Sequence, residues 1–172
     1  MNRVLEKKYK RIAGVIMLLV LILMSMTPMA ASAAGNSVIL TVEQTYSASS
    51  SQTEETFKYK LEALNQENPM PTSSSLTEYS FTITGSRSAE IGPIKFDREG
   101  IYRYLVYQVV DSVKSGYVYD MRVYMIEVYV SESLNAMVVV KNESDVKEDA
   151  IGFENRNEYI PPTSPRDRKS VV

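Results

Sequence analysis

Residues 124–130 read Tyr124-Met125-Ile126-Glu127-Val128-Tyr129-Val130, and bulky apolar side chains occupy every second position. Successive side chains of a β-strand point to opposite faces of its sheet, so this spacing is typical of a half-buried strand. The stretch Phe57-Lys58-Tyr59-Lys60-Leu61 repeats the pattern, with lysines at the alternate positions. Both stretches therefore predict strands that turn one face toward a core.

The chain after residue 33 predicts further strands and no helix. Stretches rich in Ser, Asn, Pro and Gly separate the strands, and there is no helical period or internal repeat. This pattern favours an all-β fold, an immunoglobulin-like antiparallel β-sandwich of about eight strands. The predicted strands are Ser37–Tyr46, Thr56–Leu64, Thr77–Gly85, Ala89–Phe96, Ile101–Asp111, Tyr119–Val130, Leu134–Lys141 and Ala150–Asn155.

Both ends of the chain differ from this domain. Residues 1–33 have a basic start, an apolar run from Ile12 to Met26, and the small residues Ala31-Ser32-Ala33, as a signal peptide does. The apolar run is shorter than the ~20 residues that span a bilayer. We therefore expect cleavage near Ala33, after Ala33 or Ala34, although a retained amino-terminal anchor remains an alternative. The sandwich then covers residues 34–156, and residues 157–172, rich in Pro and Arg, form a flexible tail.

Composition narrows the function. Without residues 1–33 the chain carries 14 basic and 20 acidic residues, a net charge of −6 that disfavours nucleic acid as a partner. Neither cysteine nor histidine is present, which excludes most thiol, zinc and histidine acid–base chemistry. We expect a protein that is not an enzyme and has no cofactor or metal. The many tyrosines fit a packed sandwich better than a sugar-binding aromatic platform, which stays open.

Three polar amides fall on the core-facing side of predicted strands. Gln44, Gln108 and Asn155 each continue the apolar alternation of their strand. A buried amide without a partner costs roughly 1–3 kcal/mol. The three side chains are therefore expected to lie in a mutual arrangement, hydrogen-bonded to each other or to the backbone.

The order and spacing of several motifs resemble the streptococcal pilin isopeptide-linkage domain, a repeat of Gram-positive major pilins. The resemblance covers residues 38–156, nearly the whole predicted domain. Its markers are Leu40-Thr41-Val42-Glu43-Gln44, Phe57-Lys58-Tyr59-Lys60-Leu61, Ile91-Gly92-Pro93-Ile94-Lys95-Phe96, Gly100-Ile101-Tyr102-Arg103-Tyr104, Gly116-Tyr117-Val118-Tyr119-Asp120, Glu127-Val128-Tyr129-Val130 and Ile151-Gly152-Phe153-Glu154-Asn155.

The resemblance implies a covalent linkage site. In that family a lysine of the first strand bonds to an asparagine of the last strand, assisted by a buried acid. The asparagine maps to Asn155, but the lysine maps to Gln44 and the acid to Gln108. A glutamine side chain offers neither a nucleophilic amine nor an acidic proton. Lys58 and Lys60 alternate away from the core, so we predict a degenerate site in which the bond does not form.

The resemblance also implies polymerisation by a sortase, which joins a sorting-motif threonine to a lysine of the next subunit. Ile160-Pro161-Pro162-Thr163-Ser164 is similar to such a motif, with Thr163 as the joined residue, but no membrane segment follows it. Lys147 lies near the position of a linking lysine, although a solvated loop lysine is the simpler explanation.

These observations predict an exported structural or adhesive protein of a Gram-positive cell surface or fimbrium, resembling a pilin subunit domain. Its expected partners are other pilins or cell-wall components, and it would contact the membrane only through the signal segment. The alternative is a secreted binding module for a host protein or glycan that has no role in a polymer.

Overall fold

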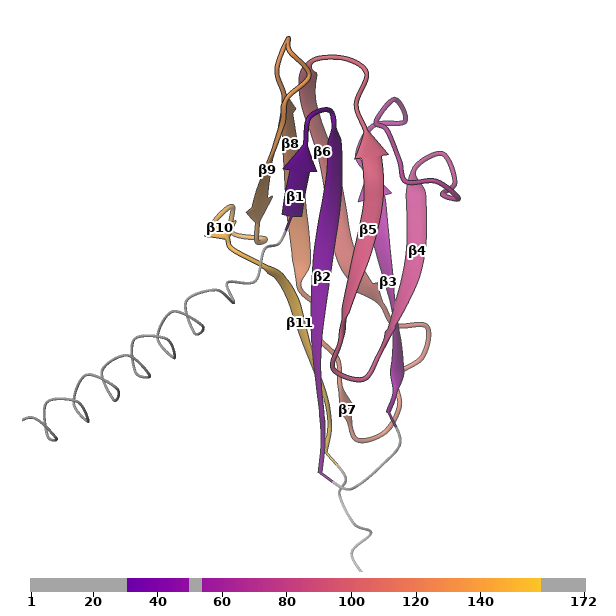
Figure 1. The fold of residues 1–172 in the computed structure, drawn as a ribbon. Coiled ribbons are helices and arrows are strands. Elements are labelled where there is room, and N and C mark those ends of the chain that lie inside the picture. Colours follow the sequence, from indigo (N-terminus) through magenta and orange to yellow (C-terminus); the bar gives the residue numbers. More distant parts are fainter. Residues whose placement is uncertain (1–30, 50–53, 159–172) are drawn as a thin grey trace, which may run out of the picture.

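Two β-sheets packed face to face make up the part of the chain that the computed structural model describes, residues 31–49 and 54–158 (Figure 1). The first sheet contains β1 (Ala31–Ala34), β2 (Ser37–Ala48), β5 (Ser88–Lys95), β7 (Tyr117–Val118) and β11 (Ile151–Asn157). The second contains β3 (Thr56–Ala63), β4 (Glu78–Thr84), β6 (Gly100–Val109), β8 (Val123–Val130), β9 (Ala136–Lys141) and β10 (Lys147–Glu148).

The first sheet is built around β2. Strand β5 pairs with one side of β2, while β1 and β11 pair with the other side, one after the other. The β2–β11 pair is parallel, running from Val42 opposite Ile151 to Ala48 opposite Asn157. The second sheet is antiparallel throughout, in the order β10-β9-β8-β6-β3-β4. The predicted sandwich is therefore confirmed, with one parallel pair at its centre.

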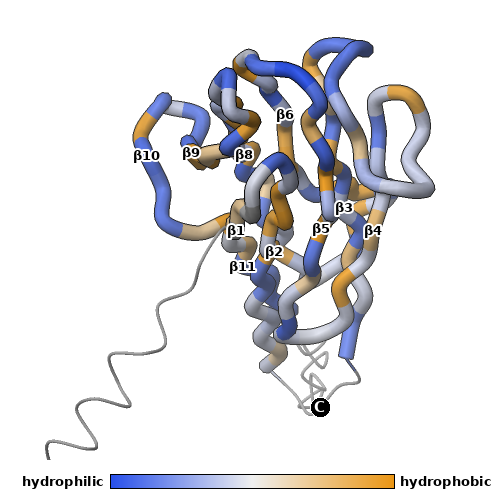
Figure 2. Tube along the Cα trace, turned by 45° about the horizontal axis from the view of Figure 1, so that its top comes forward, coloured by the Kyte–Doolittle hydropathy of each residue, from blue (hydrophilic) through white to orange (hydrophobic). Residues whose placement is uncertain are grey.

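The core forms where the predicted inward faces meet. Along β2, buried positions alternate with partly exposed ones from Ser37 to Gln44, as the period of two requires. In Figure 2 this alternation appears along the strands as a change between hydrophobic orange and hydrophilic blue. Tyr59, Tyr104 and Phe153 are among the largest fully buried side chains. These two tyrosines are core residues, as expected of a packed sandwich.

The strand pattern differs from the prediction in four places. The short strands β1, β7 and β10 were not expected, and β1 includes residues that the sequence assigns to the signal peptide. The predicted strand Tyr119–Val130 begins only at Val123. The reason is local, because the Asp120 carboxylate accepts the backbone N–H of Arg122 two residues on, a turn that competes with strand pairing.

The structure describes only part of the two ends of the chain. Residues 31–49 and 54–158 contain no helix long and apolar enough to cross a membrane. The predicted apolar signal run and most of the predicted tail, with Thr163, lie outside the described residues.

Candidate functional site

The three amides singled out in the sequence all lie in the interior. Gln44 on β2 is 4% exposed, Gln108 on β6 is 5% exposed and Asn155 on β11 is 2% exposed. Gln44 and Asn155 lie on neighbouring strands of the first sheet, whereas Gln108 lies on the second sheet. Gln44 and Asn155 are joined through a fourth residue, and Gln108 stands apart.

That fourth residue is Tyr59 on β3. Its hydroxyl donates a hydrogen bond to Gln44 Oε1 and accepts one, at 3.3 Å, from Asn155 Nδ2. The ring is held by Phe81 and Phe153, with centroid distances of 5.4 and 4.9 Å. Burial raises the pKa of Tyr59 above its usual value, so the hydroxyl stays protonated at neutral pH. A single phenol thus bridges the first long strand and the last strand.

Backbone groups fix both amides from the outside. Gln44 Nε2 donates to the Gly85 carbonyl at 2.6 Å, and Asn155 Oδ1 accepts the Asp120 N–H at 3.0 Å. These contacts decide which way each amide faces, because an amide oxygen only accepts and its nitrogen only donates. Gln44 therefore presents its oxygen to Tyr59, and Asn155 presents its nitrogen.

Gln108 lies directly opposite Tyr59 in the pairing of β3 with β6. Its Oε1 is buried and has no hydrogen-bond partner among the described residues. The side chain lines a pocket between the ends of β3 and β6, together with Phe57 and Tyr119. Of the three amides expected to lie together, Gln44 and Asn155 are connected through Tyr59, and Gln108 is not.

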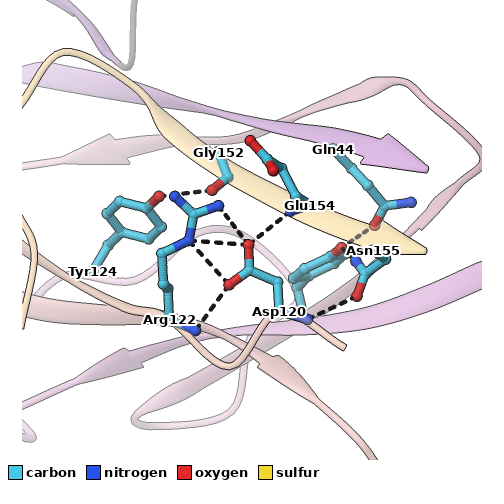
Figure 3. A network of polar contacts seen from close by, with 8 residues as sticks. Gln44, Asp120, Arg122, Tyr124, Gly152, Glu154 and Asn155 are labelled. Atoms are coloured by element: carbon cyan, nitrogen blue, oxygen red, sulfur yellow. Dashed lines mark hydrogen bonds and ion pairs between the residues drawn. The ribbon is translucent and has the colours of Figure 1, made fainter. Parts of the chain in front are cut away.

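Asp120 organises the neighbourhood of Asn155, as Figure 3 shows. Its carboxylate accepts the Glu154 N–H at 2.7 Å and pairs with the Arg122 guanidinium at 2.5 Å. Burial acts to raise the pKa of Asp120, but Arg122 and the backbone N–H groups outweigh it and hold the pKa below its usual value. Asp120 is therefore an anion that positions the loop beside β11, and it has no proton to give.

The lysines of β3 do not reach this site. Lys58 pairs with Asp111, and Lys60 pairs with Glu78 at 3.0 Å, so both are engaged on the outer face, as their parity predicted. Lys147 is exposed on β10, where its backbone pairs with Lys141. Across residues 31–49 and 54–158, no group of three or more acidic side chains has the geometry to hold a metal ion.

Sequence reasoning missed Tyr59 and Asp120. Tyr59 was placed on the core face of its strand, but nothing in its spacing indicated that its hydroxyl would meet Gln44 and Asn155. Asp120 was assigned to the predicted strand Tyr119–Val130. The one available signal was that a buried polar hydroxyl needs partners, and buried amides supply them.

The comparisons with known proteins identify the family and the fold of this domain. Residues 40–158 match the family model of the Spy0128-like isopeptide-containing domain, FctA. Because that match covers more than half of the chain, the chain belongs to this family. No curated protein matches the sequence.

Solved structures show the same fold. The major pilin protein T-13 of Streptococcus pyogenes aligns with a TM-score of 0.54 and 20% identity, over 76% of this chain and 54% of the pilin. Another major pilin structure from Streptococcus pyogenes aligns with a TM-score of 0.51 and 24% identity, over 69% of this chain and 50% of the pilin. The chain thus spans about half the length of the pilins that it matches.

Proposed function

We propose that this pilin-like domain is exported and serves as a structural or adhesive component of a Gram-positive cell surface, with its intramolecular isopeptide site lost. The observation that supports the loss is the set of contacts around Asn155. Its side chain meets Tyr59 and the Asp120 backbone, and the residue on the first strand is Gln44. An amide at position 44 is not a nucleophile, so Asn155 has no amine to react with.

The strand arrangement is suited to a domain that bears a tensile force applied at its two ends. Strands β2 and β11 are parallel neighbours, and β2 starts near one end of the sandwich while β11 finishes near the other (Figure 1). A force that enters before β2 and leaves after β11 shears the two strands against each other. In the absence of a covalent bond, hydrogen bonds and core packing alone resist that shear.

Intact-mass measurement of the exported protein tests the loss of the linkage. We expect the mass calculated for the processed chain. A mass lower by one ammonia, with a crosslinked peptide that contains Asn155, would show that the bond forms and would contradict the proposal.

The alternative function, a secreted module that binds a host protein or glycan, draws on a different observation. Ile101, Tyr129 and Met137 lie side by side across β6, β8 and β9, and Ile101 and Met137 are 52% and 59% exposed. An exposed apolar row of this kind is a feature of protein-binding surfaces.

Release of the cell-wall fraction with a cell-wall hydrolase distinguishes the two functions. A ladder of high-molecular-weight species that contains this chain supports the surface polymer. A single monomer band in the culture medium supports the free binding module.

A further inference from the structure

The Tyr59 hydroxyl touches both positions at which a linkage reaction would take place. It contacts the end of the side chain at position 44 and lies 3.3 Å from the nitrogen that Asn155 would release. On the proposed mapping of the site, the side-chain carbonyl of Asn155 is still present as the electrophile. We propose that Tyr59 is a proton relay in this site. The single substitution Gln44→Lys then makes the chain crosslink itself.

The carbonyl of Asn155 is already polarised. The Asp120 N–H points at Oδ1 from 3.0 Å, where negative charge develops when an amine attacks the carbonyl carbon. A fixed backbone donor at such an oxygen stabilises the transition state without reorganisation. The donor is held in place because the Asp120 carboxylate binds the N–H groups of Arg122 and Glu154. In this chain a backbone amide can therefore do what a protonated acid would do for the carbonyl.

The leaving group faces Tyr59. Because Asp120 fixes the amide orientation of Asn155, Nδ2 is directed toward the phenol oxygen. Nδ2 must gain a proton to leave as ammonia, and the amine that attacks must lose one. A hydroxyl in contact with both positions can give its proton to one nitrogen and take a proton from the other.

The balanced reaction in the Gln44→Lys variant is as follows. The neutral amine forms a bond to Cγ of Asn155, and the Cγ–Nδ2 bond breaks. Tyr59 passes its proton to Nδ2 and receives the proton that the amine gives up, so ammonia leaves and the phenol is restored. Burial favours the neutral amine that the attack requires.

Gln108 takes no part in these contacts. Its side chain lines the pocket between β3 and β6, and its Oε1 has no partner among the residues described. The reaction proposed for Gln44→Lys therefore uses no acid at position 108.

The experiment follows the intact mass of refolded variants over time. Gln44→Lys should lose one ammonia, and digestion should give one crosslinked peptide pair that joins positions 44 and 155. Adding Tyr59→Phe should slow the loss at least about 100-fold, the usual contribution of a positioned acid–base group. Tyr104→Phe is the matched control. Its buried hydroxyl bonds to the Pro69 carbonyl at 2.7 Å, away from the site, so Gln44→Lys/Tyr104→Phe should react like Gln44→Lys.

Each other outcome has a definite meaning. If Gln44→Lys keeps its full mass or does not fold, whereas Gln44→Lys/Gln108→Glu loses ammonia, the relay is wrong and the mapping of the site stands. If neither variant loses ammonia, the mapping behind the proposed function is wrong as well. Equal rates with and without Tyr59→Phe would leave Tyr59 no role in the proton transfer. Gln44→Lys/Asn155→Ala should never lose ammonia.

Discussion

Tyr59 makes a polar connection between the two sheets in the interior of the domain. Its hydroxyl satisfies Gln44 Oε1 and Asn155 Nδ2 at once, inside a core that is otherwise largely apolar. When a buried amide loses its hydrogen-bond partner, the free energy of unfolding falls by more than the hydrogen bond itself contributes, because the unpaired group stays desolvated. Tyr59, Gln44 and Asn155 can therefore be buried because they satisfy one another's hydrogen bonds.

The Tyr59→Phe substitution in the otherwise unchanged chain tests this dependence. We expect the free energy of unfolding to fall by about 2–3 kcal/mol, since two buried polar groups lose their partner. Urea denaturation measures the change. Tyr102→Phe is the control, because its hydroxyl bonds to the Arg98 carbonyl in an exposed setting and its loss should cost well under about 1 kcal/mol. Equal effects of the two substitutions would contradict the role given to Tyr59.

The side chain of Glu127 is buried, although the alternation along its strand places it on the outward face. It lies on the outward side of β8 yet its side chain is 8% exposed, covered by Arg103, Lys141 and Tyr129. Hydrogen bonds from Arg103, Tyr129 and Lys141 lower the pKa of Glu127 from 4.5 to about 2.

A lowered pKa makes part of the stability depend on pH. The contribution of Glu127 is fully present above its unfolded pKa of 4.5 and is lost as the pH falls toward about 2. We expect the urea midpoint to drop between pH 5 and pH 2.5, and Glu127→Gln to lower the midpoint at pH 7 and flatten this drop. The exposed Glu132 serves as the control, since Glu132→Gln should leave the pH profile unchanged. An unaltered profile in Glu127→Gln would assign the pH dependence to other groups.

At the scale of elements, β11 is protected by side chains along much of one edge. Strand β7 pairs only with Arg156 and Asn157. Further up the strand, the Asp120 carboxylate takes the Glu154 N–H and the Tyr124 hydroxyl donates to the Gly152 carbonyl at 2.6 Å. Free backbone groups on an edge strand invite pairing with another chain. Here two side chains occupy them.

Asp120→Ala should open that edge. We expect the free energy of unfolding to fall by about 2–3 kcal/mol, because hydrogen bonds to a charged group are removed next to Asn155. Amide hydrogen exchange should show the Glu154 N–H losing protection, while the N–H groups of β11 that face β2 keep theirs. Asp120→Asn retains an acceptor for Glu154 and should restore much of that protection. Unchanged exchange at Glu154 in Asp120→Ala would rule out the edge-capping role.

At the scale of the whole molecule, the parallel β2–β11 pair sets the mechanical response. Seven residue pairs, from Val42–Ile151 to Ala48–Asn157, are loaded together when the two ends are pulled apart. Bonds loaded side by side must break together, so this geometry resists force better than bonds that open one after another. The polar bridge through Tyr59 adds a connection between this pair and the second sheet.

Single-molecule pulling on a tandem array tests this response. Under the proposed loss of the linkage, the wild-type domain should unfold in one step that releases the chain between Gln44 and Asn155. Tyr59→Phe should unfold at lower force with the same released length. A released length that excludes the segment between these residues would reveal a crosslink and contradict the proposed function.

The sequence by itself determined the long strands and their inward faces. Alternation with a period of two is local information, so the burial of Gln44, Gln108 and Asn155 could be predicted from their own strands. Three features did not follow from this alternation. Glu127 is covered by residues of two adjacent strands, Asp120 interrupts a strand with its own side chain, and β11 runs parallel to β2.

Only the tertiary structure decided which inward side chains meet. Strand periodicity gives the face on which a residue lies, but the residue opposite it across the core depends on how the two sheets are stacked. That stacking brings the Tyr59 hydroxyl between Gln44 and Asn155, and leaves the Gln108 oxygen without a partner among the described residues. The sequence determined that polar groups are buried in this domain, and the packing of the sheets determined how they are connected.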